Sequence, residues 1–574
     1  MFDSLPNTVT TFADWTWEQI EPYYAELEQR PLQPGAIHQW LLDWSALTRL
    51  IFERFSRLSV AKTVDTTDEA AETAFNTYMD TVFMPSQAAE QTLRLKLLAS
   101  GLEPEGMAEP LRKMRADVAI FRQENLPLQV EERKLDSEYD KIIGAQTVRW
   151  AGEERTLTQL QPFFTTPDRA TREQIWRLAS ARQLADREAI NALWQKLLGN
   201  RRQQAHNAGF GDDYRAFRWQ ELKRFDYTPE DNKRFLAAIA EIAVPAANRI
   251  YAQKRQELGV EQLRPWDVIN DYYGLFFPPL TPFTDVADLD AKAATMFQRV
   301  DPQLGDYFAT MRAEGLLDLP NRKGKAPGGY CTAFPVAKRP FIFMNAVGSA
   351  RDVNTMLHEA GHAFHVFEIS QLPYVPQMRP NMEFNEVASM AMELLAAPYL
   401  AANEGGFYSE IGAARHRIDH LQRLILFWPY MAVVDSFQHW VYENLDAAAD
   451  PANCDAQWSE LWRRYIPGVD WSGYADEMMT GWHRKQHLYS APFYYIEYGM
   501  AQLGAVQVWA NALQDQAGAV ANYRRALALG GTVTLPELYQ TAGAKFTFDA
   551  PTLQTAVDLI ERTVAELMAV TSKQ

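Results

Sequence analysis

Apolar residues recur along most of the chain at the spacing of one helix face. The segment Ile37–Ile51 carries them every three or four residues, and Ile190, Leu193, Trp194 and Leu197 share one face in the same way. A similar stripe near the C-terminus consists of Leu553, Val557, Ile560, Val564 and Leu567. Because this period matches the turn of an α-helix, the pattern predicts a chain built mainly from amphipathic helices around large cores.

Two stretches depart from helical spacing. Residues 146–157 alternate around an Ala-Gly-Glu turn, which predicts a small hairpin. The stretch Asp318–Asn345 is rich in strand-forming residues, and Phe341–Asn345 resembles a short apolar strand with a free edge. Such an edge can hold an extended peptide by main-chain hydrogen bonds. Gly328 and Gly329 before it could let a ligand approach the backbone or could simply form a tight turn.

The segment after this strand contains His358-Glu359-Ala360-Gly361-His362, an H-E-x-x-H pattern with apolar neighbours. Residues four apart on a helix lie about 40° apart around its axis, so both rings can point at one ion. Two neutral imidazoles suit tetrahedral zinc and leave room for a third ligand and a water, which Glu359 can reach as general base. The alternative is a buried helix with two ordinary histidines, but a chance match is expected in roughly one such sequence in a hundred.

A catalytic zinc needs a third protein ligand. Glu368 stands six residues beyond the motif, but no Gly precedes it to turn the chain, so the helix should continue and carry Glu368 off the metal face. The segment Asn381–Leu395 offers Glu383, Glu386 and Glu393. Glu386 and Glu393 share an otherwise apolar face, where an unpaired carboxylate would be costly to bury. We expect Glu386 to be the ligand and Glu393 to support a ligand histidine; a solvated acidic edge is the alternative.

Composition narrows the range of partners. The formal net charge of −17 argues against nucleic acid or an anionic membrane as a partner. Cys331 and Cys454 lack neighbours at metal spacing and indicate a reducing compartment, so we expect a cytoplasmic protein. The first residues lack a basic region followed by an apolar core, so we expect no signal peptide, and no uncharged run is long enough to span a membrane. The oligomeric state stays open.

H-E-A-G-H-A-F-H at 358–365, followed by F-N-E-V-A-S-M at 384–390, resembles the oligoendopeptidase F branch of the thimet-oligopeptidase-like zinc peptidases. Residues 324–331, 341–345 and 487–498 extend the similarity. The resemblance implies a mostly α, two-lobed helical peptidase of the zincin type, with a deep central channel and a small β-sheet or hairpin near the active site. We expect residues 1–185 to form an N-terminal helical region and residues 186–574 to form the catalytic domain.

The same resemblance singles out a segment rich in His and Tyr. It implies that His487, Tyr494, Tyr495 and Tyr498 stabilise the oxyanion of the tetrahedral intermediate, since neutral N–H and O–H donors suit that charge. His483 and Tyr489 are weaker candidates. The alternative is an aromatic helix core without a role in catalysis.

We therefore predict a zinc-dependent metalloendopeptidase that hydrolyses short peptides. One alternative is a zinc carboxypeptidase, which would hold the substrate's carboxylate with Arg351, Lys325 or Arg484. Another is a non-catalytic peptide-binding protein, against which the intact Glu359 argues. A structural zinc site would normally carry Cys. The sequence does not separate zinc from cobalt or manganese.

Overall fold

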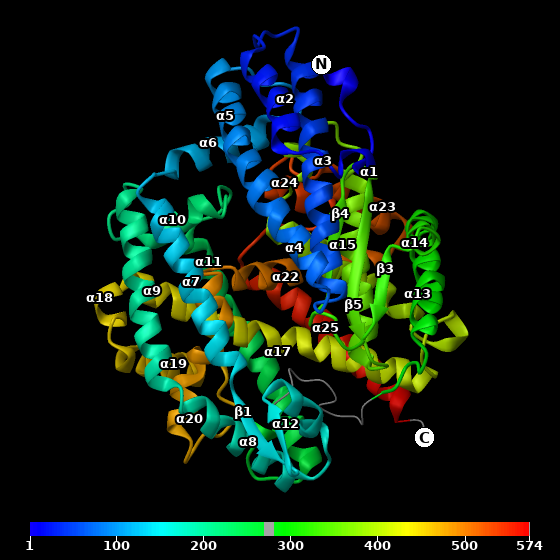
Figure 1. Ribbon diagram of the computed structural model, residues 1–574. Helices are drawn as coiled ribbons and strands as arrows, with labels where there is room; N and C mark the ends of the chain where they lie inside the picture. The colour runs from blue at the N-terminus through cyan, green and yellow to red at the C-terminus, as the bar shows by residue number, and fades with distance from the viewer. Residues whose placement is uncertain (269–279, 573–574) are drawn as a thin grey trace. The chain divides into compact units, whose positions relative to one another are not determined.

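The computed structural model describes residues 1–268 and 280–572. The described chain is mostly helical, as the apolar spacing predicted, and its strands form two small sheets (Figure 1). Its internal contacts divide it into two compact units. Unit 1 comprises Met1–Val118, Leu280–Ala413 and Gly504–Phe546, and unit 2 comprises Ala119–Pro279, Ala414–Leu503 and Thr547–Gln574.

Unit 1 contains an N-terminal group of helices with its own core, in which Trp40 and Trp44 are almost fully buried. Its second group of helices surrounds a three-stranded sheet. The helices of unit 1 are α1 (Val9–Phe12), α2 (Trp17–Gln29), α3 (Ile37–Val64), α4 (Glu69–Tyr78), α5 (Met84–Ser100), α6 (Ala108–Ile120), α13 (Val286–Val300), α14 (Pro302–Ala313), α15 (Ala350–Ile369), α16 (Met382–Ala396), α23 (Gln516–Leu529) and α24 (Leu535–Thr541). Figure 1 shows α15 beside the sheet, and α15 contacts both β4 and β5.

The sheet of unit 1 has the strand order β3 (Leu317–Pro320), β5 (Arg339–Ala346), β4 (Tyr330–Phe334). The strand β5 is parallel to β3 and antiparallel to β4. The prediction of a free edge at 341–345 was therefore wrong, because this strand is central and paired on both sides. Its nearly unbroken run of buried residues is typical of a strand covered on both faces. Among the described residues, β4 has a strand neighbour on one side only.

Unit 2 is a helical assembly with a two-stranded hairpin. The hairpin pairs β1 (Thr147–Trp150) with β2 (Glu153–Thr156), within the stretch 146–157 where alternation predicted it. The helices that lie wholly in unit 2 are α7 (Asn125–Gly144), α8 (Arg169–Leu184), α9 (Arg187–Asn207), α10 (Tyr214–Glu221), α11 (Pro229–Ala238), α12 (Val244–Leu258), α18 (Leu445–Ala448), α19 (Pro451–Tyr465), α20 (Ala475–Met479), α21 (Gln486–Ser490) and α25 (Ala550–Thr571). The long α17 (Glu410–Glu443) and α22 (Tyr495–Ala512) each have one end in unit 1.

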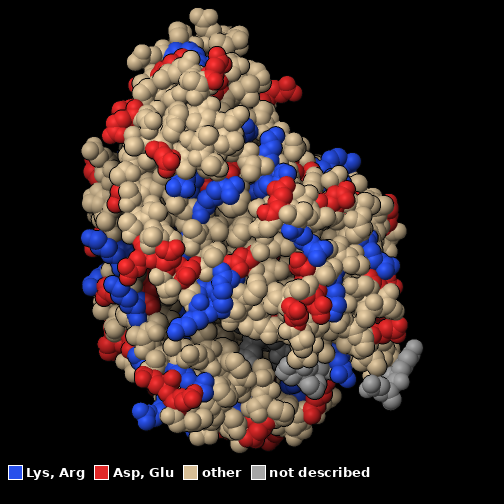
Figure 2. All heavy atoms as spheres, turned by 45° about the vertical axis from the view of Figure 1, so that its right-hand side comes forward, with Lys and Arg blue, Asp and Glu red and all other residues tan. Residues whose placement is uncertain are grey.

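The surface carries both signs of charge. On the face shown in Figure 2, acidic and basic side chains are interspersed. Within the described residues, one helical segment, Pro229–Leu258, is long and apolar enough to cross a membrane, although 56% of its most apolar window is buried inside the protein. That burial is typical of a core helix, and the segment consists of α11 and α12 with a short π-helical turn between them.

Candidate active site

The H-E-x-x-H pattern lies on α15, which begins with a reciprocal cap. Ser349 Oγ accepts a hydrogen bond from Asp352 N at 3.4 Å, and Asp352 Oδ2 accepts one from Ser349 N at 2.7 Å. These bonds satisfy two N–H groups that would otherwise lack partners at the helix start. The helix then continues through position 365 to Ile369 without a break. It holds His358 and His362 one turn apart, with ring centroids 5.0 Å apart and planes at 85°.

The second helix of the site, α16, packs tightly against α15 at Gly361. A Cβ atom at Gly361 would lie 2.6 Å from Ala388 O and 2.6 Å from Ser389 Cα, which is closer than non-bonded atoms can approach. Only a glycine therefore permits this separation of the two helices. Local sequence does not reveal this role of Gly361, because a Gly inside a helix is ordinarily only a weak helix former and its contact partner lies on another helix.

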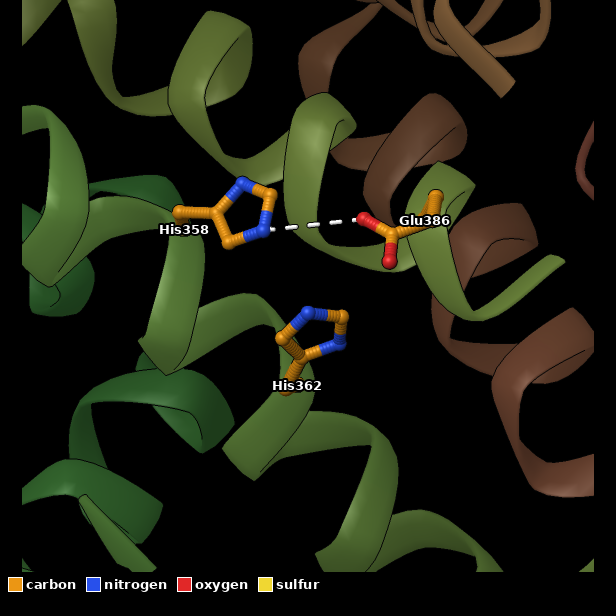
Figure 3. Close-up of side chains that lie close together, drawn as sticks. All are labelled: His358, His362 and Glu386. Carbon is orange, nitrogen blue, oxygen red and sulfur yellow. Dashed lines mark ion pairs between the residues drawn. The ribbon is translucent and has the colours of Figure 1, made fainter. Parts of the chain in front are cut away.

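The close packing places Glu386 of α16 opposite the two histidines. Figure 3 shows the rings of His358 and His362 and the carboxylate of Glu386 turned toward one another. Potential ligand atoms of the three residues all lie within 4.8 Å of one another, and His358 Nε2 is 3.6 Å from Glu386 Oε2. Two imidazole nitrogens and one carboxylate oxygen in this arrangement form a donor set that suits zinc.

The other acidic candidates have different partners. Glu393 Oε1 lies 2.8 Å from His358 Nδ1, which orients the ring and leaves Nε2 directed at the donor set. Glu368 accepts a hydrogen bond from Arg524 Nε at 2.8 Å and is not part of the group. Glu383 is buried and is also not part of the group that the described residues form.

Glu359 is buried beside the donor set, with 7% of its surface exposed. Burial and the negative charges of Glu386 and Glu393 raise the pKa of Glu359 to about 7, against the opposing effects of His358 and of the backbone N–H of Cys331. Cys331 lies on β4, and α15 contacts this strand, so β4 runs beside Glu359. A carboxylate with a pKa near neutrality can both accept and return a proton at neutral pH.

The two histidines differ in their electrostatic surroundings. Burial opposes a charge on His358, but the hydrogen bond to Glu393 and the charges of Glu393 and Glu386 outweigh it and raise the pKa of His358 to about 9. Burial and the neighbouring His358 lower the pKa of His362 to about 3. Several carboxylates around one protonated ring create a strongly negative environment, which favours a cation at this position.

The His/Tyr segment belongs to unit 2 and forms a cluster of its own. The ring of His487 lies 6.1 Å from that of Tyr494, 4.9 Å from Tyr495 and 6.4 Å from Tyr498. Burial and the charge of Lys485 lower the pKa of His487 to about 4, so this ring is neutral at neutral pH. The segment therefore gathers neutral N–H and O–H groups, as an oxyanion site requires.

The turn that precedes Tyr494 is fixed by hydrogen bonds to buried side chains. Phe493 has a backbone φ of 64°, an unfavourable region for a bulky residue, and its side chain is fully buried. Its N–H donates to Gln438 Oε1 at 2.5 Å, and its carbonyl oxygen accepts from Arg224 at 2.6 Å. Arg224 also pairs with Glu497 at 2.6 Å, so one buried guanidinium joins the turn to the first turn of α22.

The weaker candidates lie in the packed interior of unit 2. Tyr489 is fully buried and stacks on Tyr139 with ring centroids 4.0 Å apart. His483 Nε2 lies 2.9 Å from Asn191 Oδ1, and burial lowers the pKa of His483 to about 3. In unit 1, Lys325 Nζ donates to the Pro320 carbonyl at 2.9 Å and to Asp318 at 3.1 Å, so this amine serves the loop rather than a ligand carboxylate.

The chain resembles curated oligopeptidases in sequence. The chain is 24% identical over 336 residues to an oligoendopeptidase F homolog of Borreliella burgdorferi, covering 56% of this chain and 51% of that protein. It is 21% identical over 330 residues to the oligopeptidase PepF of Bacillus subtilis, covering 56% of this chain and 47% of that protein. The chain thus spans about half the length of the curated relatives it matches.

The fold and the sequence profile extend the match. A solved structure of PZ peptidase A with an inhibitor superposes with a TM-score of 0.84 at 27% identity, covering 99% of both chains. The profile of peptidase family M3 matches residues 163–557, which include both helices of the donor set and the whole His/Tyr segment. Because this profile covers well over half of the sequence, the chain belongs to peptidase family M3.

Proposed function

We propose that this peptidase is a zinc-dependent metalloendopeptidase that hydrolyses internal bonds of short peptides. The observation that carries the proposal is the convergence of His358, His362 and Glu386 beside the buried Glu359. Three protein donors leave one coordination position open, as catalytic zinc sites do, and the absence of Cys among them argues against a closed structural site.

The donor chemistry fits a zinc ion held by His358, His362 and Glu386. Glu393 holds Nδ1 of His358, so that ring can present the lone pair of Nε2, and burial keeps His362 neutral. When bound, zinc supplies a Lewis acid that polarises the scissile carbonyl and lowers the pKa of water toward neutrality.

Glu359 is the proposed general base. Its carboxylate accepts a proton from the attacking water and then donates that proton to the nitrogen of the leaving amine. The low exposure of Glu359 and its neighbouring carboxylates favour proton uptake. The nearby Gly329 adds no side chain: a Cβ there would lie 3.9 Å from Glu359 Oε1.

An extended peptide is the proposed occupant of the outer edge of β4. The strand β4 lies beside Glu359, and a peptide that adds to the edge where β4 has no strand neighbour among the described residues would be bound through main-chain groups. Recognition of the main chain suits cleavage of many different sequences. The proposed binding mode is the one expected for residues 341–345, with β4 in place of the central strand β5.

The His/Tyr segment is proposed to act in the transition state. His487, Tyr494, Tyr495 and Tyr498 offer neutral donors, which can stabilise an oxyanion without a competing negative charge. The resemblance to oligoendopeptidase F supports this assignment. It also supports a channel that admits short flexible peptides and excludes folded proteins. The two free cysteines are compatible with action in the cytoplasm.

The substitution Glu359→Gln tests the proposed base. Gln has the same size but cannot take the proton, so turnover should be lost while the metal content stays that of the wild type. Glu368→Gln on the same helix is the matched control, because Glu368 pairs with Arg524 away from the donor set. Near-normal turnover by a metal-loaded Glu359→Gln variant would refute the assignment.

A peptide blocked at both ends separates endopeptidase from carboxypeptidase activity. An endopeptidase cuts it at internal bonds, which mass spectrometry of the products locates. Resistance of the blocked peptide, together with release of single residues from the same peptide with a free carboxylate, would favour the carboxypeptidase.

A further inference from the structure

Unit 2 contains a cavity of about 330 Å³ that the proposed chemistry does not use. Its wall includes Trp176 of α8, Trp458 and Trp462 of α19, and Trp471 and Arg484 in the segment that follows. We name it the tryptophan pocket. Among the described residues that line it, Arg484 is the single charged side chain, and none is acidic.

The tryptophans present flat surfaces and unused donors. The rings of Trp462 and Trp471 meet edge to face with centroids 5.6 Å apart, and those of Trp176 and Trp471 do so at 6.0 Å. The indole N–H groups of Trp458, Trp462 and Trp471 are buried and have no hydrogen-bond partner within residues 1–268 and 280–572. An indole nitrogen can only donate, and a buried donor without an acceptor is costly.

Arg484 adds a cation whose charge the described residues leave without a close counterion. Arg484 is half-buried, and its Nη2 donates to the backbone carbonyl of Glu477 at 3.2 Å. The Glu477 carboxylate acts on it electrostatically, but no ion pair joins Arg484 to a carboxylate among the described residues. Two arginines of unit 2 that are more deeply buried are paired: Arg201 contacts Glu132 at 2.7 Å and Arg224 contacts Glu497 at 2.6 Å. Removing a cation from water without an anion beside it is unfavourable.

We propose that the tryptophan pocket binds an aromatic carboxylate, with the ring among the indoles and the carboxylate on Arg484. The volume lies within the usual range of small-molecule pockets. A guanidinium matches the geometry of a carboxylate, and a single cation in an apolar wall suits one negative charge better than the two of a phosphate. The flat indole walls favour an aromatic ring over an aliphatic chain.

Two kinds of molecule carry an aromatic carboxylate of this type: a peptide that ends in an aromatic residue, and a free aromatic acid. Tyr430 also lines the pocket, and its ring centroid lies 6.0 Å from that of Tyr495. An occupant would therefore lie close to the His/Tyr segment. The site stands on its own contacts, however, and does not depend on the proposed role of that segment.

Isothermal titration calorimetry of the intact protein tests the proposal with three probes. N-acetyl-L-phenylalanine represents a peptide terminus, 3-phenylpropionate a free acid, and N-acetyl-L-phenylalaninamide lacks the charge. At least one acid should bind with a Kd of about 1 mM or tighter, and the amide at least tenfold more weakly than the acid. Preference for the acetylated acid identifies a peptide terminus as the ligand, and equal or stronger binding of 3-phenylpropionate identifies a free acid.

Variants assign the binding to the pocket. Arg484→Gln should weaken binding of the acid at least tenfold, and Trp462→Phe, which keeps a ring but removes the N–H, should weaken it several-fold. Arg463→Gln on the exposed side of α19 is the matched control and should bind as the wild type does. Should Arg484→Gln fail to fold, Trp462→Phe decides alone. Absence of saturable binding, equal affinity for acid and amide, or wild-type affinity in the folded pocket variants would overturn the proposal.

Discussion

The substitution Gly361→Ala tests whether the close packing of α15 on α16 sets the geometry of the proposed metal site. The added methyl group would lie 2.6 Å from both Ala388 O and Ser389 Cα. Non-bonded heavy atoms prefer about 3.5–4.0 Å, so α16 must move away by roughly 1 Å. The contact atoms lie two and three residues beyond Glu386, which would therefore move with them.

The expected loss follows from the tolerance of metal coordination. Metal–ligand distances hold to about 0.2 Å, so a shift of roughly 1 Å of one ligand is severe. We expect metal affinity to fall about 10–100-fold, as for other changes that misplace a ligand, and activity to fall with it. Overpacking should cost about 1–3 kcal/mol of stability, against a gain of about 1 kcal/mol from the better helix propensity of Ala.

Competition with a chelator measures the affinity, and peptide turnover at saturating zinc measures the activity. The matched control is Gly199→Ala in the exposed middle of α9, where nothing lies within 4 Å of the new Cβ. That variant should bind metal normally and gain stability from the same helix propensity. If Gly361→Ala holds zinc as tightly as Gly199→Ala does, the separation of the helices does not determine the site.

Three further outcomes are expected. Glu386→Ala should lose metal and activity together, while Glu368→Ala should retain both because Glu368 pairs with Arg524. The metal content of both variants tests this, and loss of metal in the Glu368 variant alone would contradict the ligand set. At least one of Tyr494→Phe, Tyr495→Phe and Tyr498→Phe should lower kcat about a hundred- to a thousandfold, with KM and zinc content little changed. Normal steady-state kinetics in all three variants would indicate that these rings serve packing instead. Short peptides should be cut while a stably folded protein survives, and rapid internal cleavage of the folded protein on a gel would argue against the channel.

Much of the geometry of the candidate metal site could be predicted because it depends on local spacing along one helix. The spacing of His358 and His362 fixes their angular separation on any helix, and the absence of a Gly at position 365 lets α15 continue to Ile369. The continuing helix also carries Glu368 to Arg524 and away from the two histidines. These steps used residues within one helix, where sequence spacing translates directly into direction; Glu386 lies on a second helix, α16, and its role as ligand stays a prediction. The division of the chain at residue 185 stays a prediction.

The strand order could not be obtained in this way. Phe341–Asn345 is apolar and short, and such a run is compatible with an edge or a central strand until its neighbours are known. Leu317 pairs with Ile342 from the parallel side and Tyr330 with Phe343 from the antiparallel side. These pairings join residues more than ten positions apart in the chain, and spacing within one strand carries no information about them. Only the pairing shows that β5 is central and that β4 has an edge without a strand neighbour among the described residues.

The buried charges explain why the same residues serve both folding and chemistry. Glu359, Glu386 and Glu393 are brought close to one protonated ring, and burial of so many carboxylates is unfavourable unless positive charge offsets it. The rise in the pKa of Glu359 to about 7 is the direct effect of this crowding and of burial. A divalent cation between His358, His362 and Glu386 would relieve the repulsion, so part of the free energy of metal binding would offset the cost of gathering these carboxylates and would stabilise the fold.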